Sequence, residues 1–363
     1  MASKKSPEKT PAKIRREIQT LDQSILSAVV SRLKLVQELA RKQPTAAPSD
    51  DFLSKAASST KEMDTTDAKL LLQQIDSYCQ GQTQSQKVCY LGPKYSYSYL
   101  AATRYFGTFH DLHPVQNIGA VFSSVASGDS KFGVVPIENS TDGRIADTLT
   151  MFSQHSVAIY REVHLPINHC LIGKGRIQDI KEIRSKSQAF SQCRNWIDKT
   201  FSDKVKRVTT NSSSDAALDA VKGGKSIAAI ASRDAANGLN LKVIKSNIEN
   251  QKGNLTRFAV IVQPENPDIE LPRKSGKDKS SIMFAIPHRP GSLADVINVF
   301  KRSKLNLTWI ESFPKPGVFS EYTFFAEFQG HRDEIKVRNA MANLEKKTEE
   351  ITFLGSYPEF CAT

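Results

Sequence analysis

Polar side chains that could hold a small anion follow a predicted strand in the middle of the chain. Glu138, Asn139 and Ser140 come at the end of the apolar run FGVVPI, and a predicted helix begins near Ile145. An amide and a hydroxyl in that place can donate hydrogen bonds to a carboxylate. Glu138 is the acid of this loop, and it could orient a donor, relay a proton or cap the following turn.

Two serines stand at the start of another predicted helix. Ser96 and Ser98 follow the dipeptide Gly92-Pro93. Such serines commonly cap the helix, and a carboxylate can also bind at the positive end of a helix. The pattern allows one serine to take each role.

Histidine and cysteine side chains do not form a recognisable metal site. His110 and His113 are three residues apart, and His164 and His169 form a looser pair, but neither pair comes with a plausible set of further ligands. We therefore expect no metal. An odd number of cysteines without a CxxC pair predicts reduced thiols, namely Cys79, Cys89, Cys170, Cys193 and Cys361.

The charge of the chain restricts its class without deciding it. The 363 residues include 50 basic and 38 acidic side chains, a net charge of +12, but the positive charge is not gathered in one stripe as in many nucleic-acid binders. Dispersed charge suits a soluble enzyme of anionic metabolites equally well. No apolar run is long enough to span a membrane, and the first residues lack a secretory signal. We expect a cytoplasmic protein that binds neither nucleic acid nor membrane.

The first part of the chain predicts helices. Apolar residues recur at helical spacing over 13–42, and Arg32 lies on the same face. A guanidinium there either reaches out to solvent or points into an anion pocket. Residues 43–66 have the composition of a linker, and a second helix is expected over 67–79, ending at Gly81.

The rest of the chain predicts two further folds. From Lys87 short apolar runs alternate with helical stretches, which indicates an α/β fold with sheets covered on both faces. Residues 264–280 are rich in proline and charge and predict a domain boundary. The segment beyond has the order β-α-β-β-α-β of the ferredoxin-like fold, whose open sheet edge invites dimerisation. The helices of the α/β part are expected near 98–106, 117–127, 145–154, 188–201 and 213–222.

Several motifs in the same order resemble prephenate dehydratases. They are YLGPKYSYSYLAA at 90–102, VPIENSTDGRI at 135–145, SQAFSQC at 187–193, SSSDAA at 212–217 and NLTRFAVI at 254–261. PGSL at 290–293 and IESFP at 310–314 resemble the phenylalanine-sensing ACT domain that follows in this family.

The resemblance implies an α/β chain of three parts. An N-terminal helical segment (1–82) precedes a two-lobed, periplasmic-binding-protein-like dehydratase domain (87–264) and a ferredoxin-like ACT domain (280–358). We expect the first lobe over 87–165 with a returning strand near 254–263, and the second over 166–245. The active site is expected in the cleft between the lobes.

The implied activity is a carbon–oxygen lyase reaction without cofactor. Prephenate loses carbon dioxide and hydroxide as its ring becomes aromatic, so the protein must anchor one carboxylate and supply a donor to the leaving hydroxyl. Thr256 matches the family residue assigned to that hydroxyl, with Glu138 and Asn139 as further catalytic candidates. The substrate-binding candidates are Ser96, Ser98, Ser140, Ser185, Gln192 and Ser213.

Strand geometry separates Thr256 from its neighbour. Consecutive residues of a strand face opposite sides, so we expect Thr256 in the pocket and Arg257 bracing the fold or the interface with the regulatory domain. Two positions depart from the family pattern. Tyr95 stands where the opening loop usually has glycine, and Lys186-Ser187 replaces a His-Pro pair, so that Lys186 either anchors a carboxylate or is solvated.

The ACT resemblance implies phenylalanine as an effector and assembly as a homodimer or homotetramer. Phe313 replaces the arginine of the second motif, which removes one charged brace. The candidate phenylalanine-binding residues are Gly291, Ser292, Leu293, Glu311 and Ser312.

The N-terminal helix resembles the first helix of an AroQ-type chorismate mutase. Arg15 and Arg32 match substrate-binding arginines of that family, but Gln43 replaces a lysine, and the charged cluster of the next helix is absent. Rearrangement in such a site depends on these polar groups, so we interpret the segment as a degenerate mutase remnant. The alternatives are an arogenate dehydratase, a bifunctional mutase–dehydratase and a noncatalytic amino-acid sensor.

Overall fold

The computed structural model describes residues 10–42, 50–59, 62–141, 143–201, 205–314 and 322–359. Cys361 lies outside these residues. Two compact units are distinguished: residues 1–86 with 106–110, and the remainder of the chain. No helix of the described residues is long and apolar enough to cross a membrane.

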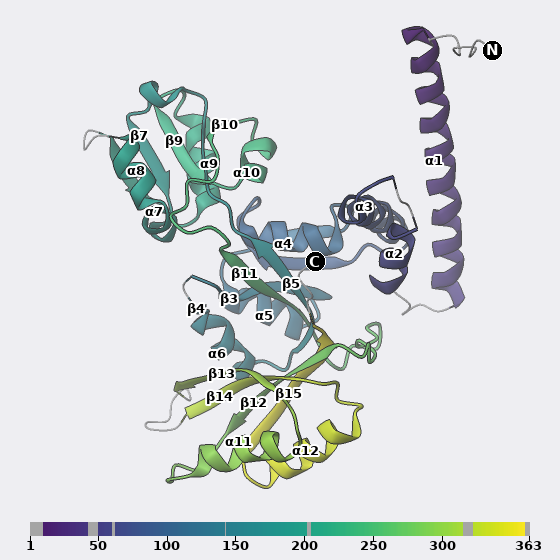
Figure 1. Cartoon of the computed structure of the whole chain (residues 1–363), viewed down its shortest axis with the longest axis vertical. Coiled ribbons are helices and arrows are strands. Elements are labelled where there is room, and N and C mark those ends of the chain that lie inside the picture. Colours follow the sequence, from purple (N-terminus) through teal and green to yellow (C-terminus); the bar gives the residue numbers. More distant parts are fainter. Residues whose placement is uncertain are drawn as a thin grey trace, which may run out of the picture. The chain divides into compact units, whose positions relative to one another are not determined.

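The first unit is helical. It contains α1 (Pro11–Lys42), α2 (Asp50–Ala57) and α3 (Thr65–Thr83), and α1 is the long helix in Figure 1. The described helix α1 has no buried residue. Arg32 forms an ion pair with Asp76 of α3.

Two details of this unit differ from the sequence prediction. The predicted linker contains α2, because Leu53 and Ala57, one helical turn apart, are buried. The helix expected to end at Gly81 continues to Thr83. Gly81 instead permits a close approach, since a Cβ there would lie 2.2 Å from the carbonyl oxygen of Phe109.

The first sheet of the second unit has the strand order β2-β1-β3-β11-β5, with β4 paired to β3. β1 runs parallel to β2 and β3, whereas β11 is antiparallel to both β3 and β5. With its helices this sheet forms what we call the first lobe. Its elements are β1 (Lys87–Leu91), α4 (Tyr97–Phe106), β2 (Asp111–Val115), α5 (Ile118–Ala126), β3 (Phe132–Asn139), β4 (Gly143–Arg144), α6 (Ala146–Gln154), β5 (Ala158–Pro166) and β11 (Leu255–Val262).

The second sheet has the order β10-β6-β9-β7-β8 and forms the second lobe. The chain passes from β5 into β6 and returns from β10 into β11, so two connections join the lobes (Figure 1). The stretch predicted as one helix over 188–201 is two short ones. The elements are β6 (Cys170–Gly173), the 3₁₀ turn η1 (Ile177–Asp179), β7 (Glu182–Ser185), α7 (Ser187–Gln192), α8 (Arg194–Thr200), β8 (Lys206–Thr209), α9 (Ser213–Lys222), β9 (Ile227–Ala231), α10 (Arg233–Gly238) and β10 (Lys242–Lys245).

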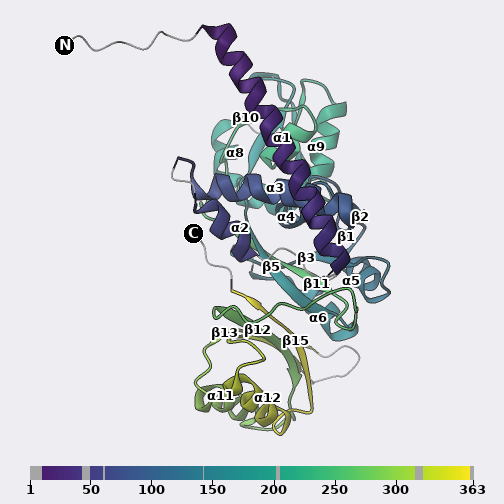
Figure 2. The same cartoon turned by 90° about the vertical axis from the view of Figure 1, so that its right-hand side faces the viewer.

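The third sheet is antiparallel, with the order β13-β14-β12-β15. Its two helices lie together on one face (Figures 1 and 2), which confirms the predicted β-α-β-β-α-β arrangement. The elements are β12 (Asp278–Ala285), α11 (Ser292–Arg302), β13 (Leu307–Pro314), β14 (Tyr322–Gln329), α12 (Ile335–Glu345) and β15 (Glu350–Pro358).

The first lobe and the third sheet share a hydrophobic core. Phe122, Leu149 and Ile261 of the first lobe belong to one buried cluster with Phe313 and Phe325 of the third sheet. The burial of these apolar side chains away from water stabilises the contact between the first lobe and the third sheet. Phe313, the residue that replaces an expected arginine, is therefore a core residue.

A buried ionic cluster lies in the same contact. The Arg257 guanidinium pairs with Glu138 at 2.7 Å, with Glu162 at 2.5 Å and with Glu327 of β14 at 2.8 Å. Lys279 of β12 also pairs with Glu162 and Glu327, at 2.8 and 3.1 Å. The predicted bracing role of Arg257 agrees with these contacts.

The cluster also controls the ionisation of Glu162, whose side chain is buried. Burial opposes the charge of Glu162, but a hydrogen bond with His164 and the cations of Arg257 and Lys279 outweigh it and hold the pKa of Glu162 below its usual range. A carboxyl whose folded pKa is depressed stabilises the fold above its unfolded pKa, and that contribution is lost as the pH falls through the folded value.

Removal of the Arg257 charge should destabilise the fold strongly. The substitution Arg257→Met would leave Glu162 and Glu327 buried without their shared guanidinium, which costs about 3–5 kcal/mol of unfolding free energy. Urea unfolding at neutral pH measures this loss. Arg273→Met is the matched control, because its pair with Glu270 is exposed at the surface and is worth at most about 1 kcal/mol. Equal effects of the two substitutions would contradict a stabilising role of the buried cluster.

Candidate active site

A pocket of about 620 Å³ lies between the two lobes. Its lining comes from the strand ends and loops of the first sheet on one side and from α7, α9 and the loops after β8 and β9 on the other. Hydroxyl, amide and imidazole groups of both lobes line the pocket, and such convergent polar groups fix the orientation of a small ligand. The predicted site residues in the lining are Ser96, Ser98, Asn139, Gln192, Ser213 and Thr256.

Thr256 and Asn139 form the polar centre of the first-lobe wall. They are register partners on β11 and β3, and the Asn139 Nδ2 donates a 2.7 Å hydrogen bond to the Thr256 Oγ1. Asn139 Oδ1 accepts from the backbone N–H of Thr141 at 2.9 Å, which fixes the orientation of the amide. Because the Thr256 oxygen accepts from the amide, its own proton is directed elsewhere and its donor strength increases.

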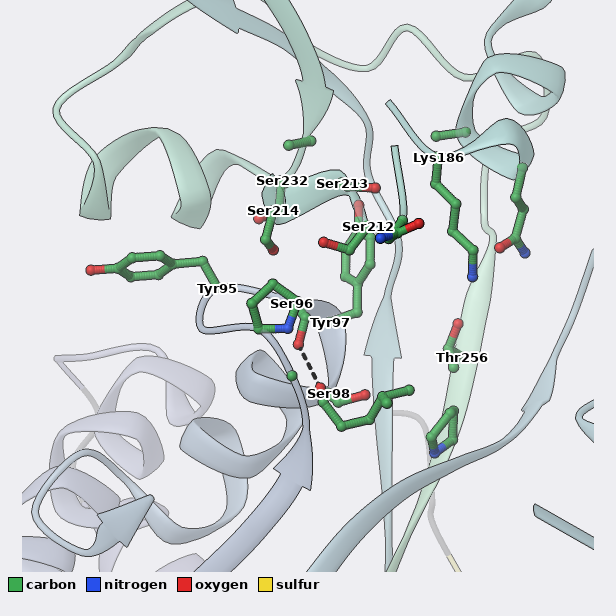
Figure 3. Close-up of a pocket in the computed structure, with 18 of the residues that line it drawn as sticks. Tyr95, Ser96, Tyr97, Ser98, Lys186, Ser212, Ser213, Ser214, Ser232 and Thr256 are labelled. Atoms are coloured by element: carbon green, nitrogen blue, oxygen red, sulfur yellow. Dashed lines mark hydrogen bonds between the residues drawn. The ribbon is translucent and has the colours of Figure 1, made fainter. Parts of the chain in front are cut away.

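The two serines at the start of α4 have separate roles. The Ser96 hydroxyl accepts from the backbone N–H of Tyr99 at 3.2 Å and donates to the Leu91 carbonyl at 3.0 Å, so Ser96 caps α4. Ser98 is buried and lines the pocket. Figure 3 shows Ser96 and Ser98 below the serines of the second lobe.

The second-lobe wall is rich in hydroxyl groups at helix starts. Ser212 caps α9 by accepting from the backbone N–H of Asp215 at 2.9 Å, and its hydroxyl lies 2.8 Å from the Asp215 carboxylate. Ser213 and Ser214 form the first turn of that helix and also line the pocket. Because Ser212 donates its proton to Asp215, which also lines the pocket, Ser213 and Ser214 are the hydroxyl donors that this helix start can offer to an anion.

Lys186 is the one lysine or arginine among the described residues that line the pocket. It immediately precedes α7, and in Figure 3 its side chain extends in the direction of Thr256. Lys186 is nevertheless exposed, so its placement is compatible with both the carboxylate anchor and the solvated lysine that the sequence allows.

His169 lines the pocket, a place that its spacing from other histidines in the sequence does not predict. Its Nε2 lies 2.8 Å from the Gln192 Oε1, and its Nδ1 lies 3.4 Å from the Tyr97 hydroxyl. Burial lowers the pKa of His169, so the neutral imidazole donates from Nε2 to the Gln192 amide oxygen, while the Tyr97 hydroxyl donates to the Asn168 carbonyl at 3.1 Å. Among the described residues no group of acids, cysteines and histidines could hold a metal ion. Tyr97, the first residue of α4, lies 72 residues from His169 in the chain, so no local pattern in the sequence predicts that the two side chains meet.

The structure does not place three predicted site residues at the pocket. Glu138 precedes Asn139 on β3, and strand alternation turns it to the Arg257 cluster. Ser140 holds its loop to β11, where its hydroxyl accepts from the Leu255 N–H at 2.9 Å. Ser185 is fully buried and donates to the Ile230 carbonyl at 2.7 Å.

The structure predicts opposite outcomes for two buried serines. Ser185→Ala removes a buried hydrogen bond, so it should lower the unfolding free energy by about 1 kcal/mol. It should leave unchanged the KM for prephenate, the substrate that the resemblance implies. Ser98→Ala is the matched variant, because it removes a hydroxyl from the pocket lining and should raise KM. Urea unfolding and steady-state kinetics on both variants decide this. A raised KM in Ser185→Ala would restore Ser185 to the binding site.

The candidate effector residues lie at two places on the third sheet and its first helix. Gly291 has a positive φ of 90° at the start of α11, and the buried Ser292 hydroxyl has no hydrogen-bond partner among the described residues. Leu293 packs against the core under the helices. Glu311 pairs with Arg144 of the first lobe at 2.7 Å, and Arg144 also donates to the Ser312 carbonyl. The second motif therefore contacts the dehydratase part.

The two mutase-like arginines do not meet in one copy of the chain. Arg15 is exposed, whereas Arg32 is partly buried against Asp76. They are 17 residues apart on α1, which corresponds to about 25 Å along the helix axis.

Comparisons with known proteins agree with this geometry. Residues 88–266 match a family model described as Prephenate dehydratase. A bifunctional chorismate mutase/prephenate dehydratase of Pseudomonas aeruginosa is 33% identical over 361 residues, which cover 95% of this chain and 97% of the relative. The chain belongs to the prephenate dehydratase family.

Two further relatives are a protein named as a prephenate dehydratase alone and a solved prephenate dehydratase in complex with L-Phe. A prephenate dehydratase of Methanocaldococcus jannaschii is 31% identical and matches 76% of this chain and 99% of its own length. The structure of prephenate dehydratase from Arthrobacter aurescens in complex with L-Phe is 27% identical, with a TM-score of 0.68, over 75% of this chain and 90% of that one. The family fold is thus the two-lobed α/β arrangement with a C-terminal sheet.

Proposed function

We propose that the pocket between the lobes converts prephenate to phenylpyruvate. The observation that carries the proposal is the Asn139–Thr256 hydrogen bond, which leaves the Thr256 proton available to a ligand. In the reaction the bond between the ring and its carboxylate breaks, and carbon dioxide leaves. The electron pair enters the ring and expels the 4-hydroxyl group as hydroxide, which Thr256 stabilises by a hydrogen bond and which then takes a proton from solvent to become water.

Each wall of the pocket then has a task. Thr256 donates to the departing hydroxyl, where negative charge develops, while Asn139 orients Thr256. The serines at the start of α9, with Gln192 and Lys186, hold the side-chain carboxylate that the product retains. The carboxylate that leaves must stay without such donors, because a poorly stabilised carboxylate is lost more readily as neutral carbon dioxide. The electron pair stays within the substrate, so the step itself calls for no redox group.

Loss of the Thr256 hydroxyl should reduce turnover. Thr256→Ala is expected to lower kcat by about 10²-fold or more, as for removal of one transition-state donor, and Thr256→Ser should retain most activity because it keeps the hydroxyl. Phenylpyruvate absorbance measures both. Near-normal turnover in Thr256→Ala would refute the role. Wild-type protein that turns over arogenate but not prephenate would assign the alternative substrate, and protein that binds without turnover would indicate a sensor.

We also propose feedback control by phenylalanine through the third sheet, in support of which a family member binds L-Phe. The Glu311–Arg144 ion pair joins the candidate effector motif to the loop after Asn139. Phenylalanine can act only through different affinities for two states of the protein. The two states would differ in phenylalanine affinity if the Arg144–Glu311 ion pair forms in one of them and is broken in the other.

L-Phenylalanine should therefore inhibit the conversion of prephenate, whereas D-phenylalanine should not. Gly291→Ala forces a side chain into a positive-φ position and is expected to raise the half-inhibitory concentration of L-phenylalanine by about tenfold without change in the uninhibited rate. Titration of both enantiomers during the absorbance assay measures this. A flat response together with no binding heat would leave the third sheet with a structural role alone.

Other assignments stay predictions. They are the domain limits 1–82, 87–264 and 280–358, a homodimer or homotetramer, a cytoplasmic location, and the reading of the N-terminal helices as a degenerate mutase. The pairing of Arg32 Nη2 with Asp76 supports the last, because it neutralises part of the positive charge that would bind chorismate.

A further inference from the structure

The opening loop contains a tyrosine in a backbone conformation that suits glycine. Tyr95 has φ 67°, in the left-handed region where a Cβ crowds the backbone and where bulky residues are outliers. A conformation of this kind persists only where surrounding contacts hold it. The contacts of Tyr95 must therefore hold this conformation in place.

Those contacts lie in the other lobe. The Tyr95 hydroxyl donates to the carbonyl of Gly238, the last residue of α10, at 3.2 Å. The Tyr95 side chain packs against the core of the second lobe. On its other side the Tyr95 ring meets that of Tyr99 of α4 edge to face, with centroids 5.5 Å apart. The ring is thus held between the first lobe and the second.

Gly238 is shaped to receive this ring. A Cβ at Gly238 would lie 2.2 Å from the Tyr95 Cε1 and 2.4 Å from its Cζ, distances that no packed structure allows. Gly238 has a helical backbone, in which alanine would otherwise be preferred. The first lobe thus has a strained backbone at Tyr95, and the second lobe has a glycine in a helix at Gly238. The contact between the two residues explains both features.

We propose that Tyr95 is a positioning residue that sets the separation of the two lobes across the pocket. Its loop continues into Ser96 and Ser98, and α10 begins after Ser232, which lines the opposite wall. Figure 3 shows the Tyr95 side chain turned away from Thr256, along the flank of the pocket. Tyr95 therefore acts by fixing the distance between the serine-rich wall and the Thr256 wall. The kinetic form of this proposal rests on the proposed dehydratase function.

A double-mutant cycle tests the contact directly. The four proteins are the wild type, Gly238→Ala, Tyr95→Gly and the double variant. In the wild-type background Gly238→Ala should raise KM for prephenate by about tenfold, because displacement of one wall by a fraction of an ångström weakens binding, while kcat changes little because Thr256 and Asn139 share the first sheet. In the Tyr95→Gly background the same alanine should leave KM unchanged, because the ring it would strike is gone.

Thermal unfolding of the four proteins gives a readout that does not depend on activity. Gly238→Ala should lower the melting temperature when Tyr95 is present and raise it in the Tyr95→Gly background, where the alanine only favours the helix. Equal shifts in both backgrounds would overturn the contact. A reversal of the melting shift with an unchanged KM in Gly238→Ala would keep the contact and overturn its positioning role.

Tyr95→Phe separates the ring from the hydroxyl and keeps the protein folded. If ring packing sets the separation, this variant retains the wild-type KM, and Gly238→Ala raises KM in its background as in the wild type. An alanine effect that disappears in the Tyr95→Phe background would overturn the role of the ring. Failure of the wild type to convert prephenate would overturn the proposed function instead, and the melting temperatures would still test the Tyr95–Gly238 contact.

Discussion

The hydrogen bond from Asn139 to Thr256 is the interaction on which the rest of the site depends. It joins register partners on β3 and β11 at their pocket ends. An ordinary alcohol is a weak acid, so its use as a donor to a departing hydroxide depends on direction and on electrostatic surroundings. The amide supplies the direction, and the backbone of Thr141 in turn fixes the amide.

The alternation of β11 links this chemistry to the rest of the fold. One residue beyond Thr256, Arg257 enters the buried cluster with Glu162 and Glu327, and the latter belongs to the third sheet. The strand that carries the proposed donor is therefore anchored on its opposite face to the part that carries the candidate effector motifs. A shift of the third sheet would act on a cluster in direct continuity with Thr256. The lobes complete the arrangement, because the binding serines and the donor come from different sheets.

Much of this organisation was predictable from the sequence. The alternation of short apolar runs and helical stretches and the final β-α-β-β-α-β pattern follow from local periodicity, and the opposite orientation of Thr256 and Arg257 follows from strand geometry alone. The motifs gave six residues of the pocket lining, Ser96, Ser98, Asn139, Gln192, Ser213 and Thr256.

The remainder depends on contacts between distant residues. Ser185 and Ser140 form hydrogen bonds with backbone groups that no local pattern reveals. Glu138 precedes Asn139 on β3, so the alternation of side chains along that strand turns it away from the pocket toward Arg257. His169 enters the site through its pairing with Gln192 and Tyr97 across the lobes. The sequence shows that Tyr95 stands where the family usually has glycine. It does not show the partner of Tyr95, because Gly238 lies 143 residues away in the chain.

A crystal structure with an unreactive analogue tests the central claim most directly. The analogue keeps both carboxylates and the ring hydroxyl but has a saturated ring, so it cannot become aromatic. The account predicts that the ring hydroxyl lies about 3 Å from the Thr256 Oγ1, within hydrogen-bond distance, with Asn139 still bonded to Thr256. An analogue whose hydroxyl points to the second-lobe serines, with Thr256 out of reach, would contradict it.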